Sequence, residues 1–552
     1  MQCRLCMFIA INKSKHSSGK VYQSILLRES YREGGKVKKR TIANLSSCSE
    51  DEINLIKNAL NQKNTPKPLA GGFEIHQGRS VGGVYVLYKI AERLGIVSAL
   101  GNSFQGKLAL WLIISRIIEQ GSRLSATRLD AQYDIASVIS LQRGFDENNL
   151  YDCLHWISEN QSEIEDSLFK TKECSQRFFW YDVTSSYLEG VHNELAAFGY
   201  NRDKKKRKRI IVVGLLCQDG GDPIAIEAFR GNTQDTQTFE NQLIKLKNRF
   251  GCESITMICD RGLIREKQKK LLDKYGFHYI TALPMPQILA LLNAGVVKID
   301  DFTDELKSFI SDERRYIYRC NPERALETRR QRQERFETAL RKVGQENQRL
   351  AEKLKASPYI AKRRIQKVLK TLCVYEWVEV NIIKRQLVLQ IDEEKLQKKS
   401  AFDGCYIWTT DLSEQELSNR EIYERYKDLK YVEDDFRSFK TGFLEVRPIF
   451  VRSEASTRGH LVVVMLAHMI LRTLRQAWSH FDKTVGEALG ELNLLCLNTI
   501  QFSDGRRTNS IPIPNNGVAQ LLKAIHVPMP RNLEECVVPV VTRRKVRKSA
   551  NH

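Results

Sequence analysis

Three acidic residues occupy positions that suit one shared metal site. Asp182 lies inside an apolar, strand-like run (FFWYDVT), and Asp260 ends a second such run (SITMICD). Glu433 comes much later, on an amphipathic stretch with helical periodicity. A charge inside an apolar strand costs free energy unless it is paired or binds a metal. Because a few carboxylates can hold a pair of magnesium ions for phosphoryl transfer, these acids predict metal-dependent chemistry on phosphates.

The helix of Glu433, expected over 421–440, allows a choice between neighbouring acids. At about 100° per residue, Glu433 falls beside the apolar stripe of this helix. Asp434 and Asp435 project away from the row of Glu433, so replacing either with asparagine is expected to leave activity intact. The apolar stripe consists of Leu429, Val432, Phe436 and Phe439, and the residues near Glu433 on the wheel are Tyr426, Lys430, Arg437 and Lys440.

Each of the three acids also has an ordinary structural interpretation. Glu433 could pair with Arg437, four residues later on the same helix. Asp182 could bond the turn that follows it, and Asp260 could bond a turn or a helix entry at the end of its strand. Taken alone, each of these alternatives stays open. The order of the elements and the charge of the chain favour the shared metal site for the three acids together.

The whole chain is strongly basic, which favours a polyanionic partner. It has 552 residues, a formal net charge of +21 and a pI of about 9.3. Nucleic acid is the first candidate for such a partner. Basic residues gather at 36–40, 204–209 and 543–548, where they either contact phosphates or form solvated surface.

The apolar runs are too short for a membrane span, which needs about 18 residues. The longest run, 461–471, also contains His468. The thirteen cysteines are scattered and often lie within strand-like runs, as reduced packing residues do. We therefore expect a cytoplasmic protein with no membrane partner.

The succession of patterns predicts an α/β fold class. Strand-like and helical runs follow one another as β-β-β-α-β-α-β across 176–284, which is the order of the RNase H-like fold, a mixed sheet with helices on its faces. A charged, helix-forming block and two alternating runs then interrupt this core. We thus predict an RNase H-like mixed-sheet catalytic core that an inserted α+β domain interrupts and that a small β-rich N-terminal region and a helical domain precede. The expected boundaries are 1–62 for the basic β-rich region, 73–172 for the helical domain, 176–284 and 406–480 for the two parts of the core, 285–405 for the inserted domain, and 481–552 for a C-terminal helical region with a basic tail.

With these motifs in place, the sequence resembles bacterial insertion-sequence transposases of the DDE class, in the cut-and-paste branch with a tyrosine–arginine–glutamate–lysine signature. Tyr426, Glu433 and Lys440 fit the spacing of that signature. Leu429 stands where the family has its arginine, with Lys430 next to it. Further similar segments are YDVTSSYLEG around Asp182, Gly231-Asn232-Thr233 ahead of the second aspartate, and Asp260-Arg261-Gly262.

The resemblance implies a DNA transposase that cuts transposon ends and transfers a 3′-hydroxyl into target DNA by a two-metal mechanism. Asp182, Asp260 and Glu433 would hold Mg²⁺, with Mn²⁺ as a substitute. The implied partners are the terminal inverted repeats and target DNA, bound by a homodimer on paired ends in the bacterial nucleoid. The residues implied to contact DNA phosphate are Tyr426, Lys430, Arg437 and Lys440.

The role of one aromatic residue stays open, and so do two other classes of function. Trp408, in the segment GCYIWTT, either stacks a flipped base or packs a strand against its neighbours. The first other class is a catalytically inactive RNase H-like DNA-binding protein, against which the intact acids argue. The second is a structure-specific nuclease without strand transfer, which joining of a 3′-hydroxyl to a second DNA would exclude.

Overall fold

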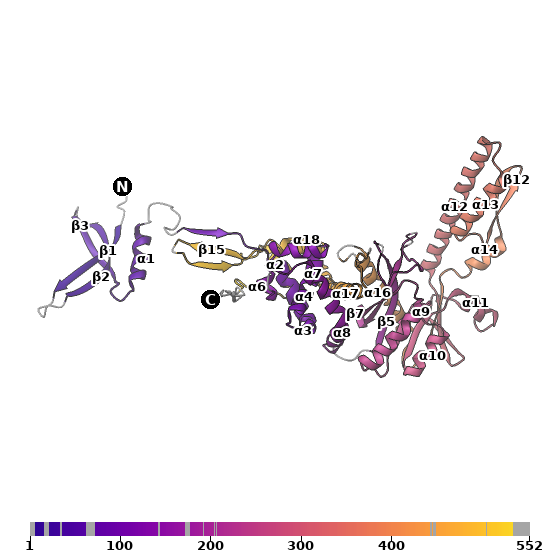
Figure 1. Ribbon diagram of the computed structural model, residues 1–552, viewed down its shortest axis with the longest axis horizontal. Helices are drawn as coiled ribbons and strands as arrows, with labels where there is room; N and C mark the ends of the chain where they lie inside the picture. Colours follow the sequence, from indigo (N-terminus) through magenta and orange to yellow (C-terminus); the bar gives the residue numbers. More distant parts are fainter. Residues whose placement is uncertain are drawn as a thin grey trace, which may run out of the picture. The chain divides into compact units, whose positions relative to one another are not determined.

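The computed structural model describes residues 6–15, 21–33, 36–61, 72–141, 144–171, 177–190, 192–203, 205, 207–441, 444, 446, 449–503 and 505–533. The chain folds into two compact units, whose elements are labelled in Figure 1. The first unit combines Met1–Arg79 with Cys496–Ile513 and Pro530–Leu533. The second contains Ser80–Leu495 and Pro514–Met529, and therefore all three acids. The basic tail expected at 543–548 lies outside the described residues.

The first unit contains two small antiparallel sheets. In one, β1 (Cys6–Lys15), β2 (Val21–Glu33) and β3 (Lys36–Asn44) pair in chain order, and α1 (Glu50–Asn61) follows. The basic hairpin that the sequence predicts is therefore present, and nearly every residue of β3 is exposed. The other sheet joins β4 (Phe73–His76) to β15 (Asn498–Phe502) and β16 (Arg507–Ser510). The C-terminal region expected to be helical therefore also contains two strands, because β15 takes a partner from the other end of the chain.

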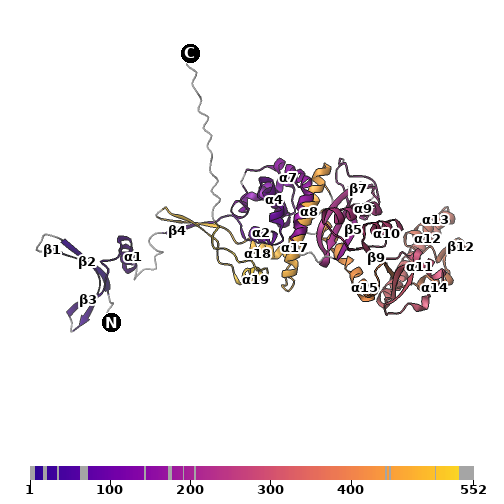
Figure 2. The same ribbon diagram turned by 90° about the horizontal axis from the view of Figure 1, so that it is seen from below.

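The second unit begins with helices that gather around a long C-terminal helix. Over the range expected to form the helical domain, the described residues form seven short to medium α-helices. The long helix α17 (Glu454–Ala477) is buried along most of its length and packs on α4, α7 and the edge strand β7. Figures 1 and 2 both show α17 between the other helices and the sheet. None of the helices in the described ranges is both long enough and apolar enough to cross a membrane. The seven are α2 (Gly82–Arg93), α3 (Ile96–Leu100), α4 (Phe104–Ile118), α5 (Arg123–Arg128), α6 (Ile135–Ile139), α7 (Glu147–Glu159) and α8 (Gln161–Lys170).

An eight-stranded mixed sheet carries the first two acids. Its strand order is β10-β11-β14-β9-β8-β5-β6-β7. The strands β5, β6 and β7 pair antiparallel, whereas β8 pairs parallel with both β5 and β9. β6 is buried on both faces, as its uninterrupted apolar run predicts. These strands and the helices between them are β5 (Phe178–Tyr187), β6 (Ile210–Gln218), β7 (Asp222–Arg230), α9 (Asp235–Ile244), β8 (Thr256–Cys259), α10 (Glu266–Tyr275) and β9 (His278–Ala282).

The register between β5 and β8 places the two aspartates side by side. Phe178 pairs with Thr256 and Trp180 pairs with Ile258 in this parallel ladder. Continuing the same register by two residues sets Asp182 beside Asp260, which directly follows β8. Side chains that share a register position on neighbouring parallel strands point to the same face of the sheet. The parallel pairing therefore brings the two carboxylates to one face.

The inserted segment is shorter than the sequence predicts. The strands β10 (Lys307–Ser311) and β11 (Arg314–Cys320) lie within the range 285–405, yet they extend the main sheet through β14 (Cys405–Thr410). Only the chain between β11 and β14 leaves the sheet. It forms a helical hairpin and a two-stranded sheet that pack on each other (Figure 1). Its elements are α12 (Pro322–Glu352), α13 (Pro358–Thr371), β12 (Val378–Ile383), β13 (Gln386–Ile391) and α14 (Glu393–Ser400).

The helix expected over 421–440 is two helices. α15 (Asn419–Lys427) ends at Asp428, and α16 (Leu429–Lys440) begins directly after it. The break is a change of hydrogen-bond pattern, because the Tyr431 N–H bonds the carbonyl of Asp428 three residues back. The chain contains neither glycine nor proline at this point, so the sequence gives no signal for the break. α16 nevertheless packs on β5, which brings Glu433 to the sheet.

Candidate active site

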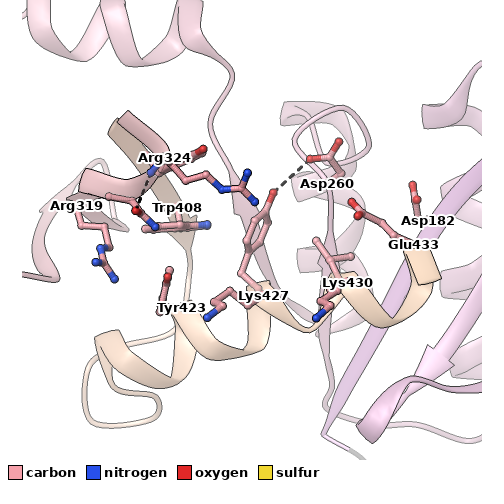
Figure 3. A pocket seen from close by; sticks show the side chains of 13 residues that line it. Asp182, Asp260, Arg319, Arg324, Trp408, Tyr423, Lys427, Lys430 and Glu433 are labelled. Atoms are coloured by element: carbon pink, nitrogen blue, oxygen red, sulfur yellow. Dashed lines mark hydrogen bonds between the residues drawn. The ribbon is translucent and has the colours of Figure 1, made fainter. Parts of the chain in front are cut away.

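Asp182, Asp260 and Glu433 line one cavity of about 460 Å³. The same three residues also line an adjoining cavity of about 470 Å³. Figure 3 shows their carboxyl groups turned toward a common space, two from the sheet and one from the helix beneath it. Residues that are far apart in the sequence thus line the same cavity.

The alternation of β5 decides which way Asp182 faces. Phe179, Tyr181 and Val183 belong to the apolar core on the face of the sheet that α9 and α10 cover. Trp180 lies on the opposite face, where its indole Nε1–H donates to the carbonyl of Arg425 in α15 at 2.9 Å. Asp182 shares this face because strand residues two apart point the same way. It therefore points toward α15 and α16, where Glu433 lies.

Asp260 is exposed and is held from two sides. Its Oδ1 accepts a hydrogen bond from the backbone N–H of Arg261 at 2.8 Å. The hydroxyl of Tyr426 in α15 donates to the same oxygen at 3.3 Å. Burial, with the negative charge of Asp260, raises the pKa of the Tyr426 hydroxyl. The tyrosine therefore stays protonated and acts as a donor that fixes this carboxylate.

The environment of Asp182 disfavours its negative charge. Burial raises the pKa of the Asp182 carboxyl to about 7. A backbone hydrogen bond from Val183 and the charge of Arg202 work against this rise, whereas the charges of Asp260 and Glu433 add to it. The three acids therefore interact electrostatically, as carboxylates that share one site do.

Glu433 does not form the ion pair that its ordinary interpretation requires. Arg437 instead pairs with Asp434, with 2.8 Å between the guanidinium and the carboxylate. Glu433 itself is exposed at the border of the buried face of α16. Its carboxylate is thus presented to the cavity, and the charged neighbours on the same helix bond each other.

Asp435 is the acid of α16 that the sequence misjudges. It points away from the cavity as expected, but it is buried and only 5% exposed. The ring of His468 in α17 donates from Nε2 to Asp435 Oδ1 at 2.7 Å, and the Cys217 thiol of β6 donates to Oδ2 at 3.8 Å. Asp435 therefore anchors α16 to its neighbours, a buried role that its direction on the helical wheel does not indicate.

The basic residues implied to contact phosphate lie around the acids, and they differ in exposure and in ion pairing. Lys430 is exposed and lines the first cavity, while the exposed Arg437 lines the second. Lys440 also lines the second cavity, but its Nζ lies 3.3 Å from the carboxylate of Asp203. Leu429, at the position of the signature arginine, is buried at the wall of the first cavity. Cationic groups therefore surround the acids.

Trp408 lies at the far wall of the first cavity, inside a cluster of aromatic rings. It is 3% exposed. Its ring makes edge contacts with Tyr423 and Tyr426 and stacks on Tyr406, with centroids 5.2, 6.0 and 5.9 Å away. Of its two interpretations, strand packing accounts for these contacts. The more exposed ring of the cluster is Tyr406, at 40%.

Several cationic residues of the cavities were missed by sequence reasoning. Arg202 lines the second cavity and pairs with Asp235 at 2.6 Å. Lys427 lines the first, one residue beyond the tyrosine of the signature. The position of Lys427 on the expected helix could have indicated that it lies near the site. Arg202 lies in an irregular segment, and no periodicity links it to the acids. Two further residues, Arg319 and Arg324, line the first cavity from β11 and α12.

The donor set fits a divalent cation, although the side chains do not converge into a defined site. Within the described residues, no group of three or more His, Cys, Asp or Glu side chains could hold a metal ion as placed. Three carboxylates nevertheless share one cavity, and their repulsion contributes to the raised pKa of Asp182. A cation between them would relieve that repulsion. Oxygen donors of this kind suit Mg²⁺ or Mn²⁺.

Two family models match the chain. Residues 9–68 match the N-terminal domain of IS1634 family transposases, and residues 173–470, more than half of the chain, match a transposase DDE domain. No curated protein matches the chain. Among solved structures, a piggyBac transposase synaptic complex with hairpin DNA aligns over 76% of this chain and 82% of that chain, with 8% identity and a TM-score of 0.35. That structural similarity is too low to support an argument, so the family models carry the assignment.

Proposed function

The chain belongs to the insertion-sequence DDE transposases, and from this premise we propose that it cuts DNA at transposon ends and joins the freed 3′-hydroxyl to target DNA. The observation that supports the site assignment is the shared cavity of Asp182, Asp260 and Glu433. These residues are the proposed metal ligands. When bound, divalent ions would activate the attacking oxygen and stabilise the leaving oxygen.

The remaining residues of the cavity prepare it for a phosphodiester. Tyr426 fixes the orientation of Asp260 through its hydroxyl. Lys430, Arg437 and Lys440 place positive charge along the α16 side of the cavities, where DNA phosphates would lie. Leu429 stands where the family has its arginine. The neighbouring Lys430 can partly replace that arginine, because lysine supplies a positive charge as a point charge.

The sheet supports an RNase H-like core. Three antiparallel strands, β7-β6-β5, continue into the parallel strands β8 and β9, with helices α9 and α10 on one face. The proposed ligands lie on the central strand β5, after its neighbour β8, and on a helix that packs on β5. This is the placement expected of an RNase H-like nuclease.

The proposed partners follow from the family and the charge. A DNA transposase acts on transposon ends and on target DNA, and we propose that a homodimer holds paired ends. The net charge of +21 supports a polyanionic partner. Mg²⁺ is the proposed ion, and Mn²⁺ should replace it because it accepts the same oxygen ligands.

Substitution of each proposed ligand tests this function. In Asp182→Asn, Asp260→Asn and Glu433→Gln, the amide keeps the shape but removes the charge that binds the metal. Each variant should lose Mg²⁺-dependent cleavage of DNA carrying the element's end sequences, measured on denaturing gels, and should still bind these ends. Asp434→Asn is the matched control, because Asp434 lies on the same helix and lines neither cavity.

Three results would contradict the proposal. Cleavage that survives in all three variants would exclude these acids as metal ligands. A wild-type protein that cuts but never joins the 3′-hydroxyl to a second DNA would be a nuclease without strand transfer. A wild-type protein that binds the ends without cutting them in either metal would be an inactive DNA-binding protein.

A further inference from the structure

Two large aromatic side chains are strongly exposed beside the proposed active site. Phe198 and Tyr200 flank Gly199 in the segment between β5 and β6, and they are 67% and 80% exposed. Exposing rings of this size to water forgoes the free energy of burying them. Neighbouring exposed aromatic residues therefore indicate a surface that a partner covers.

The backbone that carries these rings is firmly held. Ala197 and Ile210 exchange two backbone hydrogen bonds of 3.1 and 2.8 Å. Gly199 approaches Gly231 so closely that a Cβ added to it would lie 1.9 Å from the Gly231 carbonyl oxygen. The Arg202 N–H donates to the hydroxyl of Ser185 at 3.1 Å. Because the main chain is fixed on both sides of the rings, their exposure is a feature of the folded state and not of a loose segment.

Each ring has a guanidinium group over it. Arg209 lies over Phe198 with 5.9 Å to the ring centroid, and Arg202 lies over Tyr200 with 5.6 Å. A surface that alternates aromatic rings with cations suits a nucleic-acid strand, in which π-faces alternate with phosphates. An apolar protein partner suits it less well, because such a partner would have to cover the charge of Arg209 without neutralising it, whereas Arg202 already pairs with Asp235.

Tyr200, one ring of the aromatic pair, lies at the cavity of the three carboxylates. Tyr200 and Arg202 line the cavity of about 470 Å³ that Asp182, Asp260 and Glu433 also line. A DNA strand whose phosphate occupies that cavity would therefore place its neighbouring nucleotides at Tyr200 and then at Phe198.

We propose that Phe198 and Tyr200 form a platform on which unpaired bases of a DNA strand stack next to the scissile phosphate. This proposal rests on the proposed function for the identity of the polymer as DNA. Bases in a duplex already stack on each other and offer no free face to a protein ring. The platform should therefore distinguish a single strand from a duplex, which phosphate contacts alone do much less.

Binding of short oligonucleotides without divalent metal tests the platform separately from catalysis. The probes are fluorescein-labelled dT12 and a mixed-sequence duplex of 20 base pairs, titrated with the full-length protein and followed by anisotropy. In Phe198→Ala/Tyr200→Ala, the affinity for dT12 should fall roughly tenfold or more, whereas duplex affinity should change less than about twofold. Phe198→Tyr/Tyr200→Phe keeps both rings and should bind dT12 as the wild type does.

Tyr359→Ala provides the matched control. Tyr359 is a similarly exposed ring, 76%, on α13 in the inserted segment, and its removal should affect neither probe. An equal loss of dT12 and duplex binding would overturn the platform, as would unchanged dT12 binding or a wild-type protein that does not bind dT12. A change in oligomeric state by light scattering, with dT12 binding retained, would assign the rings to a protein interface and would also overturn it. Because no metal is present, these results do not depend on whether the carboxylates support cleavage.

Discussion

A single hydroxyl group links Tyr426 to Asp260, one of the proposed metal ligands. Tyr426 donates to Asp260, so we expect Tyr426→Phe to leave this carboxylate held only by the backbone N–H of Arg261 and less fixed in orientation. Loss of a hydrogen bond to a charged group should slow cleavage by about tenfold, with little change in the affinity for DNA. Single-turnover cleavage rates and a separate binding titration would measure the two quantities.

The neighbouring residue Tyr423 supplies the control for this effect. Tyr423 also contacts Trp408 with its ring, and Tyr423→Phe keeps that contact. It should therefore cleave at the wild-type rate. If Tyr426→Phe instead weakened DNA binding and left the single-turnover rate unchanged, its hydroxyl would contact phosphate and would not position Asp260.

At the residue scale, the sequence points to Asp182 and Glu433 through the residues that surround them. Asp182 is recognisable because it interrupts an apolar strand, and Glu433 because it borders the apolar stripe of a helix. The role of Asp435 is not recognisable, since its partners His468 and Cys217 come from α17 and β6. A helical wheel gives the direction of a side chain, but it does not show which polar group that side chain contacts on a neighbouring element. Sequence reasoning also missed Arg202 and Tyr200, because they lie in an irregular segment and such segments have no periodicity.

At the element scale, the position of Glu433 depends on how firmly α16 is held against the sheet and α17. Asp435 and His468 form the buried polar link, with 5% and 2% of the two residues exposed. Asp435→Ala removes one member of a buried pair and should destabilise the protein by about 3 kcal/mol. Asp435→Asn keeps an acceptor oxygen for His468 and should cost less. Thermal unfolding of both variants, with Asp434→Asn as the control on the same helix, would show this order.

Unchanged stability in Asp435→Ala would contradict the anchoring role. The cleavage rate at a temperature where the variant stays folded adds a second readout. Since Glu433 lies two residues away on α16, a loosened helix should lower the rate without removing the dependence on metal. A rate equal to that of Asp434→Asn would mean that apolar packing alone fixes the helix.

The strands that the sequence predicts and those that it misses differ in composition. β5 to β9 are apolar runs bounded by turn residues, so their order along the chain follows from pattern. β10, β11, β15 and β16 are rich in polar residues, and the two hairpins that they form join their sheets through β11 and β15, whose second partners lie far away in the chain. Tertiary pairing of this kind overrides local propensity.

At the scale of the whole molecule, the excess positive charge should govern how the protein binds DNA. Of the basic segments that the sequence points out, the strand β3 is fully described, and its lysines are exposed. Residues 9–68, which include β3, match the N-terminal domain model of transposases. We therefore expect β3 to make phosphate contacts of its own, in addition to those near the acids.

Salt dependence measures these contacts. The logarithm of the binding constant should fall steeply with the logarithm of salt concentration, with a slope of about −0.9 for each phosphate that is neutralised. Lys36→Gln/Lys39→Gln, both on exposed positions of β3, should make the slope shallower by roughly 2. Lys367→Gln/Lys370→Gln on α13 changes the net charge equally at exposed positions and should alter the slope much less. Equal effects of the two double variants would mean that net charge attracts DNA without a contact at β3. A wild-type affinity that hardly changed between low and physiological salt would exclude an electrostatic origin for the binding altogether.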